Sequence, residues 1–205
     1  MIHSYSSLKM YLTCPYKYYR TYITKDVPRP SGPALARGTK VHDELEQAVK
    51  QKKTPHNIWM PDGLLEWVWS KGGRAEVPLA INNKLEWVDF WDSSAVLRGK
   101  LDVVVLDNKR VFAIDWKTGQ HRVDTLQARV YRFLLMRGQP GTLTFMWVFV
   151  DQAISEARDY THEGDKQVAT LIHTINKHKT RDFIPKNNWM CGRFCEVPEC
   201  PLQGE

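Results

Sequence analysis

The chain has 205 residues, of which 42% are hydrophobic and 11% aromatic, so it can bury a core of its own and needs no partner to fold. Lys and Arg number 29 against 23 Asp and Glu, and this net charge of +6 favours a polyanionic partner. No apolar run approaches the ~20 residues of a membrane span, and no signal-peptide pattern is present. We therefore expect a single cytoplasmic domain with no membrane contact, whose thiols stay reduced.

The first 33 residues are predicted to form a helical segment. Ser4 to Ser7 give a helix-start signal, and Cys14-Pro15 interrupts the helical pattern. Tyrosines interleaved with basic residues follow, and such rings and cations could stack bases and hold phosphates. Tyr18 and Arg20 are therefore candidate DNA-binding residues, although packing of these tyrosines against the body of the protein is at least as plausible.

A second helix is predicted after the Pro/Gly-rich loop Val27 to Pro33. Gly38 and Thr39 are expected to open it, and its apolar stripe is Val41, Leu45, Ala48 and Val49. His42 falls near the start of this helix, where an imidazole nitrogen can reach a metal. Taken alone, such a histidine is more often an ordinary surface residue. Residues 53–75 are expected to include a short Trp-rich helix packed on the sheet.

From Ala75 the periodicity changes to that of strands. Residues 75–81, 84–90, 95–107 and 110–118 are predicted to form an antiparallel meander. Glu76 lies on the first of these strands. It could face a site shared with carboxylates further along the chain, and a solvated glutamate at a strand edge is about equally plausible.

Two carboxylates and a lysine stand on the predicted hairpin formed by residues 103–106 and 111–114. Asp102 opens the first strand, Asp115 ends the second, and Lys117 points to the same face as Asp115 because strands have period two. Paired carboxylates can hold Mg²⁺, and a nearby lysine can orient a nucleophile or offset developing charge. A lone Asp-x-Lys is weak support by itself, since it also fits a strand end followed by a turn.

The remaining regular elements are expected to complete a layered fold. Residues 123–138 predict an amphipathic helix ending at Gly138, with Gln127 and Tyr131 on one face. These two side chains could touch a phosphate or a base, although, taken alone, packing of a helix rim on the sheet is the more plausible explanation. Residues 142–151 predict a strand, and residues 160–179 a helix lying across it.

Four cysteines form a split set. Cys191, Cys195 and Cys200 lie within ten residues, and Cys14 lies far away beside a proline. In a cytosolic protein this pattern is typical of four thiolate ligands to one metal centre, either a 4Fe-4S iron–sulfur cluster or Zn²⁺. Such a centre would clip the two ends of the chain together. The alternative is four unrelated cysteines that pack as small hydrophobic residues.

Taken in order, these residues resemble the successive motifs of the RecB-like branch of the PD-(D/E)XK nuclease superfamily. The matching positions are Gly38-x-x-x-His42, Asp102, Asp115-Trp116-Lys117-Thr118-Gly119 and Gln127-x-x-x-Tyr131. The split cysteines resemble those of its iron–sulfur members, which include the AddB nuclease domain, CRISPR adaptation nucleases and phage exonucleases. The C-x3-C-x4-C spacing departs from the commoner C-x2-C-x5-C arrangement, which leaves iron–sulfur and zinc both open.

The resemblance implies a role for each of these positions. His42, Asp102, Asp115 and the carbonyl of Trp116 are the implied ligands of Mg²⁺ or Mn²⁺, and Lys117 is the implied catalytic lysine. Gln127 and Tyr131 are implied to border the active site and help position the DNA strand. The implied activity is metal-assisted phosphodiester hydrolysis of DNA from an end, with single-stranded DNA as the expected substrate, in recombination, repair or phage DNA processing.

The predicted fold is α/β: a central mixed β-sheet flanked by helices, of restriction-endonuclease type, closed by a terminal four-cysteine metal clip. The 205 residues are expected to form one nuclease domain, with an N-terminal Cys14 segment over 1–33, a core over 34–183 and a cysteine cluster over 184–205. Two other readings stay open. One is a DNA-binding module with an inert site, and the other is a subunit that acts with a helicase, recombinase or integrase partner. The chain could also form an oligomer.

Overall fold

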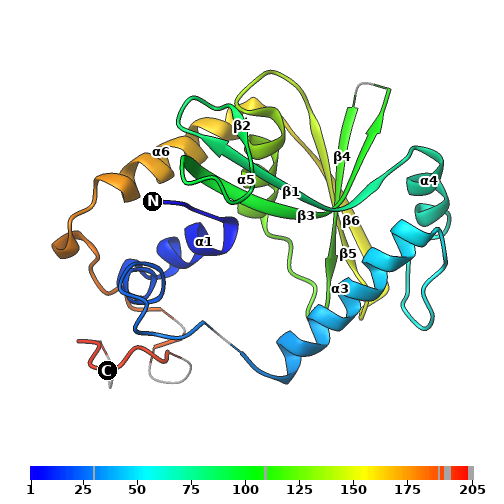
Figure 1. Cartoon of the computed structure of the whole chain (residues 1–205). Coiled ribbons are helices and arrows are strands. Elements are labelled where there is room, and N and C mark those ends of the chain that lie inside the picture. Colours follow the sequence, from blue (N-terminus) through cyan, green and yellow to red (C-terminus); the bar gives the residue numbers. More distant parts are fainter. Residues whose placement is uncertain (30, 109, 189, 192–194, 203–205) are drawn as a thin grey trace.

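The computed structural model describes residues 1–29, 31–108, 110–188, 190–191 and 195–202. Within them lies one six-stranded sheet in the order β2-β1-β3-β4-β5-β6 (Figure 1). Only β4 and β5 run parallel, and every other neighbouring pair is antiparallel. The predicted mixed sheet is confirmed. The strands are β1 (Arg74–Asn82), β2 (Trp87–Val88), β3 (Ala95–Asp107), β4 (Arg110–Lys117), β5 (Leu143–Phe149) and β6 (Ile154–Tyr160).

A crossover helix, α5 (Thr125–Met136), joins the two parallel strands β4 and β5. Parallel neighbours need such a connection because a tight turn cannot reverse the chain direction twice. Asp124 caps the start of α5 by accepting hydrogen bonds from the backbone N–H groups of Leu126 and Gln127. Arg137 and Gly138 follow in the left-handed conformation (φ 52° and 73°), so the helix ends where its glycine predicts.

One face of the sheet is covered by α3 (Pro33–Gln51) and α4 (Leu64–Ser70), as Figure 1 shows. Leu45 and Val49 of α3 and Leu65 of α4 are buried there against strands β3, β4 and β5. The predicted apolar stripe of α3 and the predicted Trp-rich helix are thus confirmed. Helix α3 begins at Pro33, five residues before the predicted start at Gly38, because a proline is favourable at the first helical position.

The other face is covered by α5, and α6 (Asp165–Lys177) packs on α5. Val130 and Phe133 of α5 share one apolar cluster with Val168, Ile172 and Ile175 of α6. The expectation that this last helix lies across the β5 strand is therefore wrong. Strand β6 was also not predicted, because its side chains are all exposed or half-buried and carry no apolar alternation. The predicted strand over 84–90 shortens to β2.

The C-terminal tail lies beside the N-terminal helical segment (Figure 1). The N-terminal segment forms α1 (Tyr5–Thr13), α2 (Pro15–Tyr18) and the π-helix η1 (Tyr19–Ile23), and Cys14 separates α1 from α2 as predicted. The tail contacts this segment through Lys186 Nζ to the Leu12 carbonyl (3.4 Å) and Arg20 Nη1 to the Pro198 carbonyl (3.3 Å). None of the described helices combines the length and apolarity needed to cross a membrane.

Candidate active site

Three carboxylates meet at one level of the sheet, on the adjacent strands β1, β3 and β4. Ala75 and Val77 pair with Val103 and Leu101, which places Glu76 opposite Asp102. The pairing of β3 with β4 ends at Val103 and Ile114, so Asp102 and Asp115 are the next residues along. Cross-strand neighbours lie close together in an antiparallel sheet. The strand register therefore gathers acidic residues that are up to 39 positions apart in the sequence.

His42 of α3 completes a cluster with Glu76 and Asp102. One ligand atom from each of these three side chains lies within 4.8 Å of the others. His42 Nδ1 is 3.3 Å from Asp102 Oδ2, which also accepts a hydrogen bond from the backbone N–H of Trp116 (2.8 Å). Carboxylate oxygens with one imidazole nitrogen suit Mg²⁺ or Mn²⁺. The donor set therefore fits a divalent cation.

Asp115 is held beside this cluster by two neighbours. Lys117 Nζ lies 2.5 Å from Asp115 Oδ2, and the Gln127 side-chain amide donates to Asp115 Oδ1 (2.6 Å). Asp115 is only 4% exposed. Burial, and secondly the charge of Asp102, raise its pKa to about 6, while Lys117 and His42 oppose that rise. A cation bound between Asp102 and Asp115 would offset the repulsion between the two carboxylates.

His42 responds to the same acidic surroundings. Burial alone lowers the pKa of its imidazole, but the Asp102 carboxylate outweighs burial, so the pKa lies above its ordinary value. The carboxylates around His42 thus favour its protonated ring. Deprotonation of His42 would then accompany metal binding, because only the neutral ring can act as a ligand.

The backbone of Glu76 is strained. Its φ is +52°, a left-handed conformation that non-glycine residues rarely adopt, in the middle of strand β1. Its carboxylate forms an ion pair with Lys100 of β3. Strain of this kind costs on the order of 1–3 kcal/mol and persists at functional sites where the surroundings enforce it. In this conformation a carboxylate oxygen of Glu76 lies within 4.8 Å of ligand atoms of Asp102 and His42.

The end of β4 is fixed by contacts beyond the carboxylates. Asp151 accepts a hydrogen bond from the backbone N–H of Gly119 (2.7 Å) and pairs with Arg37 of α3 (2.5 Å). The hydrogen bond from Arg37, and then that from Gly119, lower the pKa of Asp151 to about 2. A Cβ added at Gly38 would lie 3.2 Å from Thr118 Oγ1, so this glycine lets α3 approach the segment after Lys117.

Three of the four predicted DNA-binding residues have well-defined contacts in the structure. Gln127 is 3% exposed and its amide donates to Asp115, so it borders the site, and its part in positioning a DNA strand stays a prediction. Tyr18 is 1% exposed and stacks on Tyr22 and Phe183, so the prediction that it contacts DNA is wrong in this structure, and core packing explains it. Tyr131 donates to the Lys100 carbonyl (3.1 Å), next to the acidic cluster.

The DNA contact of Arg20 remains a prediction, as does metal binding by the Trp116 carbonyl. The Arg20 guanidinium pairs with Asp26 (2.6 Å) and lies over the ring of Tyr16. The indole of Trp116 is buried in the core, and the backbone N–H of this residue serves Asp102. Neither observation tests the proposed contacts with DNA or metal.

The four cysteines are all described, and none forms a disulfide. Cys14 is buried, whereas Cys191, Cys195 and Cys200 are half-buried on the tail that contacts the N-terminal segment. Within the residues that the structure describes, no three of these sulfurs lie within 4.8 Å of one another. The fold thus brings the two cysteine-bearing segments together, and the four-ligand centre stays a prediction.

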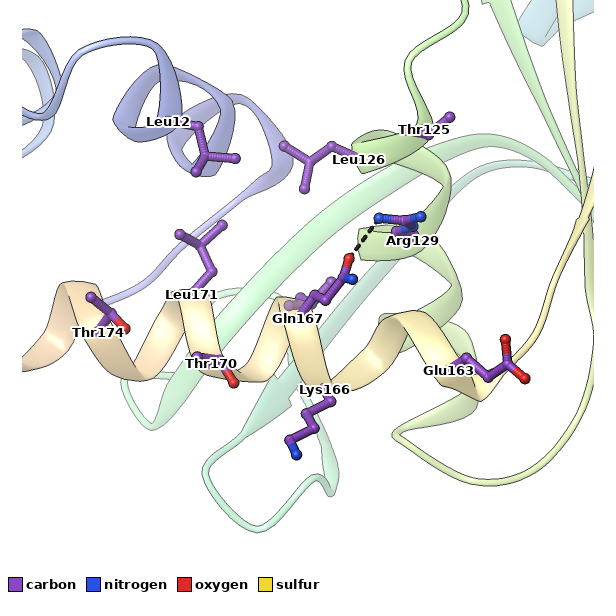
Figure 2. A pocket seen from close by; sticks show the side chains of 11 residues that line it. Leu12, Thr125, Leu126, Arg129, Glu163, Lys166, Gln167, Thr170, Leu171 and Thr174 are labelled. Carbon is purple, nitrogen blue, oxygen red and sulfur yellow. Dashed lines mark hydrogen bonds between the residues drawn. The ribbon is translucent and has the colours of Figure 1, made fainter. Parts of the chain in front are cut away.

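Two features of the site escape sequence reasoning. Glu76 is part of the acidic cluster with His42 and Asp102. Its place there follows only from the pairing register of β1 with β3, which the sequence pattern does not give. No sequence pattern predicts the ion pair of Arg37 with Asp151, because the two residues are 114 positions apart in the chain. A pocket of about 750 Å³ between α1, α5 and α6 lies apart from this site, because Glu76, Asp102 and Asp115 are not among its lining residues (Figure 2). Leucines and the hydrogen-bonded pair Arg129–Gln167 (2.6 Å) are among its lining residues.

The mixed sheet carries a carboxylate cluster and a lysine at its centre, a set of groups that fits a divalent cation. The model of the PD-(D/E)XK nuclease superfamily matches residues 3–75 and 60–200. The chain belongs to the PD-(D/E)XK nuclease superfamily. A search of curated proteins finds no match. Among solved structures, the crystal structure of SSO0001 is similar in fold, with a TM-score of 0.54 and 14% identity over 98% of this chain and 85% of that one.

Proposed function

We propose that the protein is a metal-dependent deoxyribonuclease of the RecB-like branch that hydrolyses single-stranded DNA or DNA ends. One observation carries the proposal. Lys117 Nζ lies against Asp115, beside the cluster of His42, Glu76 and Asp102. This juxtaposition combines cation ligands with a primary amine that can face a phosphate. The net charge of +6 supports a polyanionic substrate.

The residues that would hold Mg²⁺ or Mn²⁺ are His42, Asp102 and Asp115, with Glu76 added by the structure. The Trp116 carbonyl is a further proposed ligand. A bound divalent cation lowers the pKa of water and stabilises charge on the phosphoryl group. Asp115 Oδ2 is buried and lies 2.5 Å from the Lys117 ammonium, so a bound cation would share this oxygen with that ammonium or take its place.

Lys117 and Gln127 act on that site from within the chain. The Lys117 ammonium can orient the attacking water and offset the charge that develops on the phosphate oxygens. Gln127 fixes the Asp115 carboxylate through Oδ1 and so leaves Oδ2 toward Lys117. The clamp of Arg37 and Asp151 on Gly119 restrains the segment that follows the lysine. Positioning of this kind is a major part of catalysis.

The test is degradation of single-stranded DNA labelled at its 5′ or 3′ end, with Mg²⁺, Mn²⁺ or a chelator. We expect metal-dependent release of label, and the label released first gives the polarity. Asp102→Asn should abolish the release. If metal-loaded protein binds the DNA and leaves both labels intact, the nuclease proposal fails. The chain would then be a binding subunit for a helicase, recombinase or integrase partner.

Glu76 provides a prediction that separates metal binding from stability. Glu76→Gly removes a carboxylate and relieves the positive φ, so we expect Mn²⁺ affinity to fall about tenfold or more while the folded state is stabilised by up to about 1 kcal/mol. Isothermal titration with Mn²⁺ and thermal melting measure the two effects. Glu76→Gln is the control that keeps the strain and the side-chain size. Unchanged Mn²⁺ affinity in both variants would remove Glu76 from the ligand set.

The cysteine set supports a second part of the proposal. Cys14, Cys191, Cys195 and Cys200 are proposed to bind one 4Fe-4S cluster, or alternatively Zn²⁺, which clips the tail to the N-terminal helices. Hydrogen bonds from Lys186 and Asn188 to the backbone of residues 12 and 13 already bring the tail beside Cys14. The sulfurs would close around a metal as it binds, because such sites gain much of their order from the metal itself.

Cys14→Ser should remove one ligand of this centre. Since the clip closes nearly the whole chain into a loop, we expect loss of the metal and a destabilisation of several kcal/mol. Iron, zinc and sulfide analysis of anaerobically purified protein, together with thermal melting, measure both. Ser6→Ala, on the same helical segment, is the control. Wild-type protein without iron or zinc, together with an unchanged melting temperature in Cys14→Ser, would exclude the centre.

A further inference from the structure

A second pocket, of about 390 Å³, lies between α1, α2 and the loop that leads from β4 to α5. Its volume falls within the range of about 300–1,000 Å³ that is usual for small-molecule sites. Cations and apolar groups share its lining, and hydroxyl groups complete it. The cations are Lys9, Lys17 and Arg122, and the apolar surfaces come from Tyr5, Met10 and Met190.

Lys17 is the unusual member of this lining. It is only 5% exposed, and it has no carboxylate partner within the residues that the structure describes. A buried charge is costly unless it is paired, and Arg132, the other buried cation of the described chain, does pair with Asp165. Lys17 is thus a largely buried residue at the pocket wall, and no ion pair joins it to a carboxylate of the described residues.

Asp124, which lies beside the pocket, does not supply a counter-charge to Lys17. It accepts a hydrogen bond from Tyr5 (2.7 Å) and pairs with Lys9 (2.7 Å), so it balances the charge of Lys9. Lys17 and Arg122 are left with a net positive charge in the pocket. An anionic ligand would neutralise both groups, and a phosphate accepts hydrogen bonds from lysine and arginine together.

The pocket is linked to the catalytic carboxylate by a short series of contacts. Tyr5 bonds to Asp124, and Asp124 accepts a hydrogen bond from the Gln127 N–H (3.3 Å). The Gln127 side chain in turn donates to Asp115 (2.6 Å). The charge of Asp115 is also among the causes that raise the pKa of Tyr5, after burial and Asp124. A ligand in the pocket would therefore lie next to the site of cleavage.

We propose that this pocket binds one nucleotide unit of the DNA strand, with its phosphate on Lys17 and Arg122 and its base against Tyr5, Met10 and Met190. The inference rests on the proposed nuclease function and names a subsite for its substrate. Flat apolar and aromatic surfaces accept any base, so this subsite holds the strand without reading its sequence.

The first experiment measures binding of a single-stranded oligonucleotide by fluorescence anisotropy, without divalent metal, over a series of salt concentrations. Each lost phosphate contact should lower the slope of log K against log salt by about 0.7 for a single strand. We expect that decrease in Lys17→Met and again in Arg122→Met, with weaker binding at low salt. Lys166→Met on α6 removes the same charge from an exposed position and is the matched control, with a wild-type slope.

A second experiment distinguishes the two sources of the nucleotide. Thymidine 5′-monophosphate should raise the melting temperature of wild type but not of Arg122→Met if the pocket takes a free or terminal nucleotide. A slope change without this stabilisation identifies an internal nucleotide of the strand. Wild-type slopes in both Lys17→Met and Arg122→Met overturn the proposal. If Lys17→Met fails to fold, Arg122→Met decides. Wild type that binds DNA with these slopes but never cleaves it contradicts the nuclease function alone.

Discussion

Replacing Lys117 by alanine is expected to lower the rate of DNA cleavage by at least about 100-fold, the loss that follows removal of a group that stabilises transition-state charge. The ammonium group lies 2.5 Å from Asp115 Oδ2 and is about a quarter exposed (28%), so it can face both the carboxylate and a substrate phosphate. The change also leaves the buried Asp115 carboxylate without its cation, so thermal melting of the variant accompanies the cleavage assay. Single-turnover cleavage of labelled single-stranded DNA measures the effect.

The control for this prediction is Lys71→Ala. Lys71 also pairs with a strand aspartate, Asp107 (2.9 Å), and its side chain is similarly exposed at 37%. Its partner Asp107 is the last residue of β3, away from Asp102, so cleavage should stay near the wild-type rate. Binding of the oligonucleotide should survive in both variants. Lost binding with retained cleavage in Lys117→Ala would contradict the role given to this lysine.

Replacing Arg132 by methionine is expected to destabilise the fold by about 3–5 kcal/mol, the range for breaking a buried ion pair. Arg132 is fully buried on α5. It pairs with Asp165 at the start of α6 and donates to the carbonyls of Gln139 and Gly141, both at 2.9 Å. Its loss leaves a buried carboxylate and two carbonyls without their donor. For a domain of this size the melting temperature should fall by roughly 10 °C.

Two further variants make this prediction specific. Arg132→Met combined with Asp165→Leu removes both charges, so most of the lost stability should return. Arg158→Met breaks an exposed pair with Glu156 and should change the free energy of unfolding by less than about 1 kcal/mol. Thermal and urea unfolding compare all of them. Equal effects of Arg132→Met and Arg158→Met would show that burial does not govern the Arg132 pair.

Local sequence patterns predict most of the helices and strands. The alternation and β-branched runs of 95–107 and 110–117 gave β3 and β4, and the 3.6-residue periodicity gave α3 and α5. Strand β6 has no such pattern, since its faces are both largely solvated. Helix α3 starts earlier than the pattern predicts. The Pro/Gly-rich stretch before Gly38 is typical of a loop, whereas Pro33 opens the helix.

The sequence by itself determined the chemistry of the site: a histidine, two aspartates and a lysine in the order of a nuclease family, on strands whose period puts Asp115 and Lys117 on one face. Only the tertiary structure decided which groups meet there. The β1–β3 register brings Glu76 to Asp102, the packing of α5 commits Gln127 to Asp115, and core packing hides Tyr18. These outcomes depend on register and burial, which join residues distant in the chain and leave no local periodicity to detect.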